Sequence, residues 1–392
     1  MPTQRKSGRE ARTKKPASSQ QQAARQDDAR YMRLALREAA RGLGRTSPNP
    51  AVGALIVSAD GRRILAHGWH RAAGQTHAEI EALRALSDPR AAAGATLYVT
   101  LEPCSTHGRT PPCTAAILNA DLARVVVGAV DPNPAHAGRG LTLLRTAGVQ
   151  VRAGVLGAEC ARLNRAFNHW IVTGQPWVIA KAALSLDGRL NRAPGEDPWL
   201  TSPAARAHAH RTLRACVDAI LVGAGTVRTD NPRLTVRELG QPAPGTPRQP
   251  WRVVLTRSGD LPADAHVFTD EWKARTLVFR ARHSADQTLR EVLADLGRRH
   301  VTSVLIEGGG EVLGQAFREG VVNEVAFYLA PRLAAGAQTV LGAHAQPREG
   351  AALLEPRYER IGSDLCCRGL VRHQKPPGAS RKQNLDETST GV

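Results

Sequence analysis

The segment from residue 76 to residue 113 reads THAEIEALRALSDPRAAAGATLYVTLEPCSTHGRTPPC, and it combines a regular alternation of elements with side chains that bind metals. Apolar residues recur at helical spacing over residues 77–86, and residues 96–100 form a short run typical of a buried strand. The Pro-Pro pair before Cys113 favours the start of another helix. This order of helix, strand and helix predicts an α/β fold in which helices cover a sheet.

His77, Cys104 and Cys113 are the candidate zinc ligands in this segment. One imidazole and two thiolates give zinc a tetrahedral environment with one position open for water, whose pKa falls to about 7. Glu79 matches the H-x-E arrangement, in which a carboxylate that is not a ligand carries the proton from the attacking water to the leaving amine. Both cysteines precede or open helices, where the helix dipole favours thiolate over thiol. The sequence therefore predicts a hydrolytic zinc deaminase with Glu79 as its catalytic residue.

The cysteine spacing differs from the common deaminase signature, which ends in P-C-x-x-C. Here the eight residues 105–112 separate Cys104 from Cys113. The alternative is that His77 caps a helix and both cysteines are core thiols. The coincidence of a helix-opening His-x-Glu with a strand followed by Pro-Cys favours the metal site. We interpret His107 as a solvated loop residue and not as a competing ligand.

The alternation of helices and strands continues on both sides of this segment. The other elements expected in the first half are helices over residues 31–41, 114–119 and 140–147 and strands over 52–57, 125–130 and 149–151, with a break at Ser47-Pro-Asn-Pro50. The pattern stops near Gly174, and a new strand begins at Trp177. We expect a basic disordered tail over residues 1–27, a deaminase domain over 28–174, a second domain over 175–374 and a disordered tail over 375–392.

Two glycine-rich turns are the main feature of the second half. The elements expected there are helices over residues 203–215, 285–298 and 311–319, strands over 177–184, 219–222, 252–255, 303–306 and 324–329, and a surface loop over 238–249. Leu221-Val-Gly-Ala-Gly-Thr-Val227 and Ile306-Glu-Gly-Gly-Gly-Glu311 each place glycines between a strand and a helix, where backbone N–H groups can bind phosphate. Neither is a complete G-x-G-x-x-G fingerprint, so glycines needed only for tight turns are the alternative.

Composition limits the classes of protein to consider. A length of 392 residues favours two domains. The net charge of +18 is spread along both halves, and an aromatic content of 4% offers few platforms for base stacking. We therefore expect no nucleic-acid partner, and interpret the charge as background composition that also attracts an anionic, phosphorylated substrate.

Cysteine usage and hydropathy predict the compartment. Six scattered cysteines do not resemble a disulfide framework, which favours a reducing environment. The sequence contains no run of 18 apolar residues and no apolar stretch of the kind found in secretory signals. We expect a cytoplasmic protein with no membrane partner. The sequence leaves the oligomeric state open, a homo-oligomer included.

From about Tyr31 to Leu333 the chain resembles the bifunctional deaminase/reductase family of riboflavin biosynthesis. In the first half the resemblance rests on Pro48-Asn-Pro-Ala-Val-Gly53, His77-Ala-Glu79, Tyr98-Val-Thr-Leu-Glu-Pro-Cys104, Gly108-Arg-Thr-Pro-Pro-Cys113 and Asp131-Pro-Asn-Pro134. The eight-residue cysteine spacing is the one that this family uses. The resemblance implies a cytidine-deaminase-like α/β/α sandwich that removes the 2-amino group of a diaminopyrimidinone carrying ribose 5′-phosphate. It also implies Asn49 as a substrate-pocket residue, although Asn before Pro is a common turn former.

The second half resembles the reductase domain of the same family, which has a dihydrofolate-reductase-like α/β fold. The matching stretches are Lys181–Arg189, Trp199–Ser202, Gly225–Pro232, Leu234–Arg237, Glu307–Gly309 and Ala330–Leu333. The resemblance implies reduction of the ribosyl side chain to ribityl by NADPH. It implies cofactor contacts by Ala183, Trp199, Thr226, Asp230 and the Gly309–Gln315 turn, Gly310 included, and substrate contacts by Arg214, Leu234, Arg237 and Glu307. A guanidinium group suits a phosphate because it can bind two oxygens at once.

The second half also departs from the family at four positions. Asp197, His208, Thr256 and Asn323 stand where the family commonly has Ser, Asp, Asp and Asp. A further negative charge at Asp197 is unfavourable near a phosphosugar. Two alternatives follow for the whole chain: a nucleic-acid base deaminase such as one acting on tRNA, or a deaminase whose second domain binds ligands without catalysis.

Overall fold

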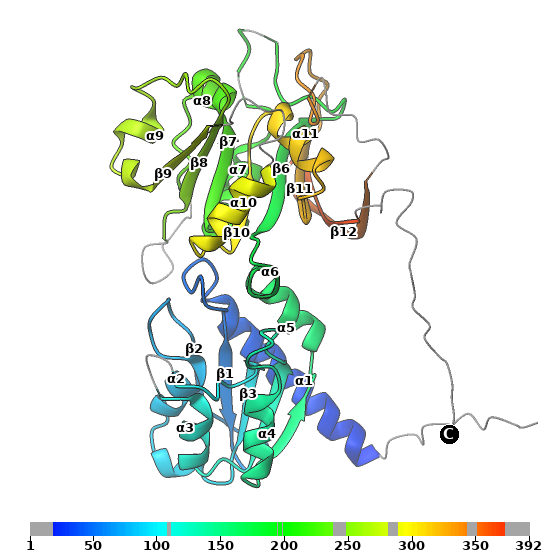
Figure 1. Cartoon of the computed structure of the whole chain (residues 1–392). Coiled ribbons are helices and arrows are strands. Elements are labelled where there is room, and N and C mark those ends of the chain that lie inside the picture. The colour runs from blue at the N-terminus through cyan, green and yellow to red at the C-terminus, as the bar shows by residue number, and fades with distance from the viewer. Residues whose placement is uncertain are drawn as a thin grey trace, which may run out of the picture. The chain divides into compact units, whose positions relative to one another are not determined.

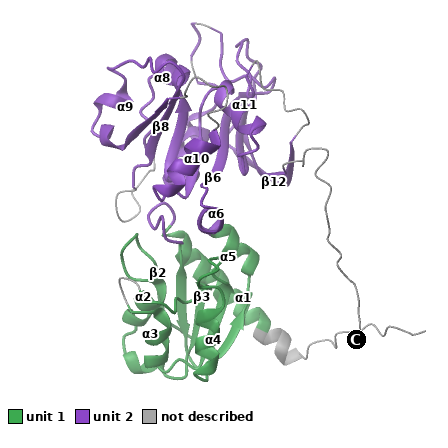
Figure 2. Ribbon diagram, viewed as in Figure 1, with its two compact units in different colours: residues 1–42, 51–163 green, residues 43–50, 164–392 purple. Residues whose placement is uncertain are grey.

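The computed structural model describes residues 19–107, 111–193, 195–197, 199–237, 248–280, 289–342 and 351–372, with side chains from residue 25 onward. The chain divides into two compact units, Met1–Gly42 with Ala51–Leu163 and Leu43–Pro50 with Asn164–Val392 (Figure 2). The expected boundary at residue 174 therefore lies after the observed one, at the end of helix α6 (Arg165–Thr173). The tail expected over 375–392 lies outside the described residues, as does most of the loop expected over 238–249.

The first unit is built on a five-stranded mixed sheet with the order β2-β1-β3-β4-β5 (Figure 1). The strands are β1 (Gly53–Val57), β2 (Ile64–Trp69), β3 (Thr96–Leu101), β4 (Arg124–Ala129) and β5 (Gln150–Ala153). β1 is antiparallel to β2 and β3, whereas β3, β4 and β5 are parallel. The carboxyl ends of β3 and β4 therefore lie at one edge, where Cys104 and the 131–138 loop follow them.

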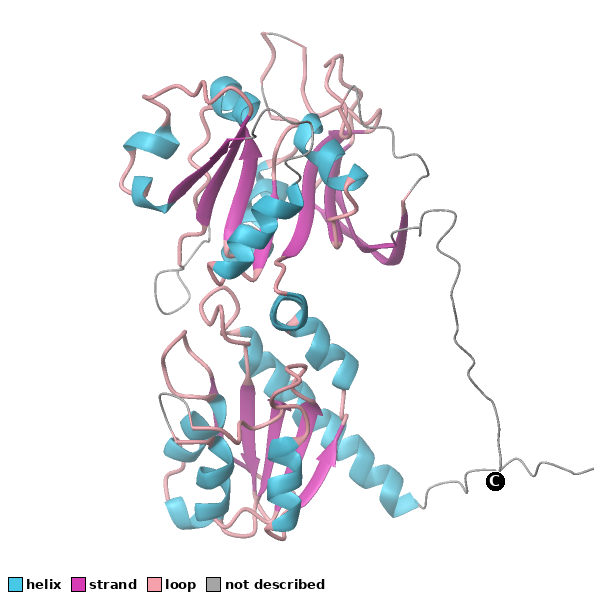
Figure 3. Ribbon diagram, in the orientation of Figure 1, coloured by secondary structure: helices cyan, strands magenta, loops and turns pink. Residues whose placement is uncertain are grey.

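Helices cover both faces of this sheet (Figure 3). They are α1 (Ser19–Ala40), α2 (Ala78–Arg84), α3 (Cys113–Asn119), α4 (Arg139–Thr146), α5 (Gly157–Leu163) and the 3₁₀ turn η1 (Pro89–Ala92). Alternate strand residues point to opposite faces, so Ile56 packs with α2, α3 and α4, whereas Leu55 packs with α1 and α5. The predicted α/β/α sandwich is confirmed.

Helix α1 is fastened to the sheet by Asp28, whose side chain is 1% exposed. Its carboxylate accepts hydrogen bonds from the Tyr98 hydroxyl at 2.8 Å and from both terminal nitrogens of Arg124 at 2.9 and 2.7 Å, and it also pairs with Arg152. Burial acts to raise the pKa of Asp28, but these partners outweigh burial and lower it. The tail expected over residues 1–27 ends just before this anchor, although α1 already begins at Ser19, inside that range.

The second unit contains an eight-stranded sheet with the order β12-β13-β11-β6-β10-β7-β8-β9. The strands are β6 (Trp177–Ser185), β7 (Ala219–Gly223), β8 (Trp251–Thr256), β9 (Thr276–Arg280), β10 (Ser303–Ile306), β11 (Glu324–Ala330), β12 (Ala352–Ile361) and β13 (Asp364–Arg372). Six neighbouring strands, from β11 to β9, are parallel, and the β12–β13 hairpin adds antiparallel strands beside β11. The sequence pattern had predicted neither strand of this hairpin.

Two groups of helices sandwich this second sheet. The helices are α6, α7 (Pro203–Thr212), α8 (Ala224–Asp230), α9 (His266–Thr269), α10 (Leu289–Arg298) and α11 (Gly310–Arg318), with 3₁₀ turns η2 (Arg214–Cys216) and η3 (Lys273–Arg275). Leucines of α10 and α11 pack on one face, and residues of α7, α8 and α9 pack on the other. Among the described residues, no helix is long and apolar enough to span a bilayer.

Candidate functional site

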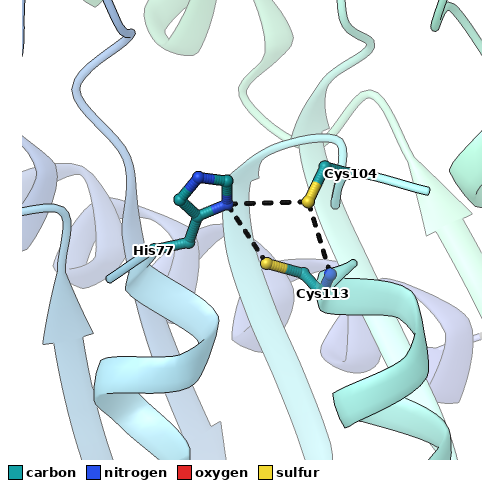
Figure 4. A group of neighbouring side chains, drawn as sticks. All are labelled: His77, Cys104 and Cys113. Carbon is teal, nitrogen blue, oxygen red and sulfur yellow. Dashed lines mark hydrogen bonds between the residues drawn. The ribbon is translucent and has the colours of Figure 1, made fainter. Parts of the chain in front are cut away.

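Three chain segments place the candidate zinc ligands at the starts of two helices and the end of a strand (Figure 4). His77 is the N-cap residue of α2, with φ −71° and ψ 160°, and its side chain makes no capping hydrogen bond. Cys104 follows β3 after Pro103, and Cys113 is the first residue of α3, behind the N-cap Pro112. The imidazole and both sulfurs point toward one another, so the structure brings all three predicted ligands together.

The distances among these donor atoms suit a zinc ion. His77 Nδ1 lies 3.6 Å from Cys104 Sγ and 3.3 Å from Cys113 Sγ, and all three donor atoms lie within 4.8 Å of one another. Zn–N and Zn–S bonds of about 2.0–2.1 and 2.3 Å at tetrahedral angles separate nitrogen from sulfur by roughly 3.6 Å. Exposed His107 lies outside this group, as expected.

The two cysteine side chains have opposite parts in one hydrogen bond, in which Cys113 donates and Cys104 accepts. Donation by the Cys113 thiol, with further support from His77, lowers the pKa of Cys104 to about 4. The Cys113 backbone N–H also donates to Cys104 Sγ at 3.3 Å. The hydrogen bond to Cys104, together with burial, raises the pKa of Cys113. Two adjacent thiolates repel each other, so a divalent cation is what allows both sulfurs to be deprotonated at once.

Glu79 lies in the first turn of α2, and its side chain is 3% exposed. Burial raises its pKa to about 7, although the neighbouring His77 acts in the opposite direction. A carboxyl group with a pKa near neutrality can both accept and return a proton, which is what general acid–base catalysis needs. Its place two residues after a ligand on the same helix puts this group beside the sulfur and nitrogen donors, where the Cys113 thiol interacts with it.

Asn49 lies in the segment 43–50, which belongs to the second compact unit. Its backbone N–H donates to the Thr46 carbonyl at 2.8 Å, the turn geometry expected of Asn in this motif. The same segment is held by the Ser47 hydroxyl, which donates to the Asp218 carboxylate at 2.6 Å. The structure thus places Asn49 in a turn of the segment 43–50.

A cluster of buried charges forms the candidate substrate site of the second unit. The Arg214 guanidinium binds Glu307 through two parallel hydrogen bonds, Nε to Oε1 at 2.8 Å and Nη2 to Oε2 at 2.5 Å. Burial acts to raise the pKa of Glu307, but Arg214 and Lys181 outweigh burial and hold it at about 2. Arg214 Nη1 also donates to the Thr235 carbonyl at 3.1 Å. Two predicted substrate contacts are therefore paired with each other.

Two residues of this cluster were not predicted as site residues. Burial lowers the pKa of Lys181 on β6, and burial also lowers the pKa of His210 on α7, to about 4. The strand register shows why Lys181 belongs here, because Ala180 pairs with Ile306 and places the next residues of β6 and β10 side by side. A lysine inside an apolar strand was the signal available in the sequence.

The two glycine-rich turns meet at the carboxyl ends of the neighbouring strands β7 and β10. The Gly309 N–H donates to Thr226 Oγ1 at 3.3 Å, which links the first turn of α8 with the N-cap of α11. A Cβ atom on Gly223 would lie 2.8 Å from Val312, and one on Gly310 would lie 2.1 Å from the Thr339 carbonyl oxygen. Close packing therefore requires glycine at both positions, and it brings two helix N-termini together.

The other predicted contacts surround these turns and the charged cluster. Asp230 lies one helical turn after Thr226 on α8, and burial raises its pKa. Ala183 lies two residues after Lys181 and therefore on the same face of β6. The Trp199 side chain is 55% exposed and stacks on Arg206.

Leu234 and Arg237 belong to the segment that follows α8. Leu234 is 2% exposed and has φ +51°, a strained backbone conformation for a non-glycine residue. Exposed Arg237 donates its backbone N–H to His210 Nδ1 at 3.0 Å. That bond ties the segment to the charged cluster.

Each of the four departures from the family has a local partner. Asn323 Oδ1 accepts the Val178 N–H at 2.8 Å, and His208 Nδ1 lies 2.9 Å from the Tyr328 hydroxyl. Thr256 Oγ1 accepts the Gly259 N–H at 3.0 Å, and Asp197 Oδ1 accepts the Trp199 N–H at 3.0 Å. Their hydrogen bonds support strands and turns, and none of these bonds reaches the Arg214–Glu307 pair.

Comparisons with known proteins cover both halves of the chain. Residues 25–129 match the cytidine and deoxycytidylate deaminase zinc-binding region, and residues 176–367 match the RibD C-terminal domain. The riboflavin biosynthesis protein RibD of Synechocystis is 40% identical over 88% of this chain and 96% of its own, and that of Mycobacterium tuberculosis is 43% identical over 79% and 87%. The solved structure of Acinetobacter baumannii RibD, 35% identical, has a TM-score of 0.80 and covers 89% of this chain and all of its own.

These findings define a zinc-binding deaminase domain joined to a reductase domain. The chain belongs to the RibD family of riboflavin biosynthesis proteins. It is a bifunctional enzyme of that pathway, a hydrolytic deaminase that uses zinc and a reductase that uses NADPH. The family assignment accounts for both halves of the chain. It does so without the two alternatives raised by the sequence, a nucleic-acid base deaminase and a second domain without catalysis.

Proposed function

We propose that the deaminase substrate is 2,5-diamino-6-ribosylamino-4(3H)-pyrimidinone 5′-phosphate and that the reductase then converts the ribosyl side chain of the deaminated product to ribityl. The Thermotoga maritima structure, 33% identical with a TM-score of 0.79, is named as a diaminohydroxyphosphoribosylaminopyrimidine deaminase and 5-amino-6-(5-phosphoribosylamino)uracil reductase. The observation that carries the proposal is the convergence of His77, Cys104 and Cys113 beside buried Glu79.

In the first unit, His77, Cys104 and Cys113 would hold the zinc, which supplies a Lewis acid that makes water a usable nucleophile near neutral pH. Glu79 takes the proton from that water and delivers it to the leaving amine, so the 2-amino group departs as ammonia. Its elevated pKa suits both steps, because the carboxyl group is not locked in either protonation state at neutral pH. Asn49 is proposed as a substrate contact on the family resemblance alone.

In the second unit, NADPH supplies the hydride that reduces C1′ of the sugar. Thr226 and the Gly309–Gln315 turn would bind its phosphates with backbone N–H groups, because two helix N-termini meet there. Ala183, Trp199, Asp230 and Gly310 complete the proposed cofactor contacts.

Arg237, Leu234 and the Arg214–Glu307 pair form the proposed substrate site. Because Arg214 is already bound to Glu307 through two hydrogen bonds, we assign it chiefly to holding that carboxylate, and Arg237 to the phosphate. Arg237 is exposed, so an anion in solution can reach it.

The proposed partner is a small phosphorylated pyrimidine, with no nucleic acid and no membrane. A cytoplasmic location is supported by all six cysteines being unpaired. A homo-oligomer stays compatible with this function.

The test uses the purified full chain with the diaminopyrimidinone phosphate and measures ammonia release and loss of NADPH absorbance separately. We expect ammonia without NADPH, and NADPH oxidation only after deamination. Ammonia release from a tRNA substrate, with none from the pyrimidinone, would contradict the proposal.

A further inference from the structure

Glu102 lies between strand β3 and the Cys104 ligand, and it has no role in the site described so far. Its side chain is 7% exposed, and its carboxylate accepts hydrogen bonds from four backbone N–H groups. The donors are Asp131 and Gly138 to Oε2, at 3.2 and 2.9 Å, and Gly140 and Leu141 to Oε1, at 2.9 and 3.4 Å. Four donors match the roughly four lone-pair positions of a carboxylate.

These donors come from the loop after β4 and from the first turn of α4. Gly138 is the N-cap residue of α4 and has no side chain with which to bind the free N–H groups of that turn. The Glu102 carboxylate, just after the end of β3, takes this capping role at a position where the helix dipole also favours a negative charge. Glu102 therefore fixes helix α4 to the chain that leads directly into Cys104.

Packing at the next residue reinforces this link. A Cβ atom on Gly140 would lie 2.2 Å from the carbonyl oxygen of Pro103, so the α4 backbone lies directly against the peptide that joins Pro103 to Cys104. On the other side, the Glu102 backbone N–H donates to the Ala129 carbonyl at 2.9 Å. The short segment before the ligand is thus held by β4, by α4 and by the loop between them.

We propose that Glu102 is a positioning residue of the deaminase site. Through its four hydrogen bonds it fixes the Pro103–Cys104 peptide and so keeps Cys104 Sγ at its place in the ligand set. The same bonds hold the 131–138 loop, whose Asp131 carboxyl group lies close enough to Cys104 for the two to interact. This inference rests on the proposed zinc-binding role of His77, Cys104 and Cys113.

The test replaces Glu102 with Gln in the full chain and measures zinc release to an excess of the chelator 4-(2-pyridylazo)resorcinol. Glutamine keeps the size but has one acceptor oxygen, and its amide nitrogen would face N–H donors. Groups that support metal ligands typically change metal affinity 10–100-fold, so we expect zinc release to be faster by at least about tenfold. The kcat of ammonia release should fall, and reduction of the deaminated substrate should be unchanged.

Asp28→Asn is the matched control. Asp28 is likewise a buried carboxylate of the same unit with several donors, but it anchors α1 on the opposite face of the sheet. Both variants should lose stability in thermal unfolding. Only Glu102→Gln should release zinc faster at a temperature where circular dichroism shows both to be folded.

A second variant covers the case in which Glu102→Gln does not fold. Gly140→Ala pushes α4 away from Pro103, so it should also speed zinc release. Gly148→Ala is its control: a φ of +89° strains an alanine just beyond the other end of α4, but nothing lies within 4 Å of a Cβ there, so this change does not push α4 away from Pro103. Zinc release at the control rate in Glu102→Gln, or in Gly140→Ala if the first variant is insoluble, would overturn the positioning role. Wild-type protein without zinc would instead overturn the proposed function.

Discussion

The zinc site of the first unit and the charged site of the second are assembled by different means. His77, Cys104 and Cys113 lie within 37 consecutive residues and are held by backbone features, two helix starts and a strand end. Arg214 and Glu307 are 93 residues apart and are held by each other. A backbone-built site should lose its function without losing its fold, whereas a site built from paired charges should lose both together.

Loss of a ligand is the largest effect we expect. Cys104→Ala leaves one thiolate and one imidazole, so bound zinc should fall from one per chain to near zero and ammonia release should become undetectable. Metal analysis by mass spectrometry and an ammonia assay check this. If reduction of the deaminated substrate is lost as well, the effect of the zinc site is not confined to the first unit. The contrast with the charged site of the second unit would then fail.

The Glu79→Gln variant tests whether Glu79 carries the proton without binding the metal. Zinc should be retained, because Glu79 is not a proposed ligand, while the rate of ammonia release should fall by about 10²–10⁴-fold. Zinc content and the kcat of ammonia release, measured on the same preparation, test both expectations. Near-normal ammonia release would assign proton transfer to another group.

Arg214→Ala tests the second half of the comparison. It leaves the buried Glu307 carboxylate without its main partner, which for buried ion pairs costs about 3–5 kcal/mol of folding free energy. Chemical unfolding should show this loss in the second unit, together with loss of reduction. The Arg214→Met, Glu307→Leu double variant should be more stable than either single variant, yet equally inactive. A fully stable Arg214→Ala would mean that the pair is not what holds the site.

Arg237→Ala should affect binding alone. Loss of a charge-assisted contact of roughly 1.5–3 kcal/mol corresponds to a tenfold to hundredfold rise in the pyrimidine KM. Steady-state kinetics of the reductase measure this, and the melting temperature, NADPH affinity and ammonia release should stay near wild type. An unchanged KM would remove Arg237 from the proposed phosphate site.

Asp197→Ser is the smallest change. Asp197 caps the Trp199 N–H, a bond that a serine hydroxyl can also accept. Removing the negative charge should leave NADPH oxidation unchanged or up to a fewfold faster. A slower reductase would show that Asp197 itself assists the reaction.

The zinc site could be predicted from the sequence because its residues are local and its chemistry is specific. The positioning of Cys104 by Glu102 could not, because the partners of that carboxylate are backbone groups 29 to 39 residues further along the chain. The pairing of Arg214 with Glu307 was missed for the same reason. Both residues were identified from the family resemblance, but each was assigned to substrate and not to the other.

The elements that the sequence pattern missed are mainly exposed ones. Strand β12 has only three half-buried residues among exposed ones, so it lacks the apolar alternation that predicts a strand. Strand β2 is a short edge strand with a Gly in it, and α6 has no fully buried residue. Buried strands such as β1, β7 and β10 were predicted to within one or two residues, because burial is what imposes an apolar pattern.

The segment 43–50 belongs to the second unit although the chain on both sides of it belongs to the first. The deaminase fold is therefore not one uninterrupted stretch of the gene. A cut at residue 164 would leave the 43–50 segment on the first fragment and Asp218, the acceptor of the Ser47 hydroxyl, on the second. The second unit therefore takes part of its packing from a segment that precedes most of the first unit in the chain.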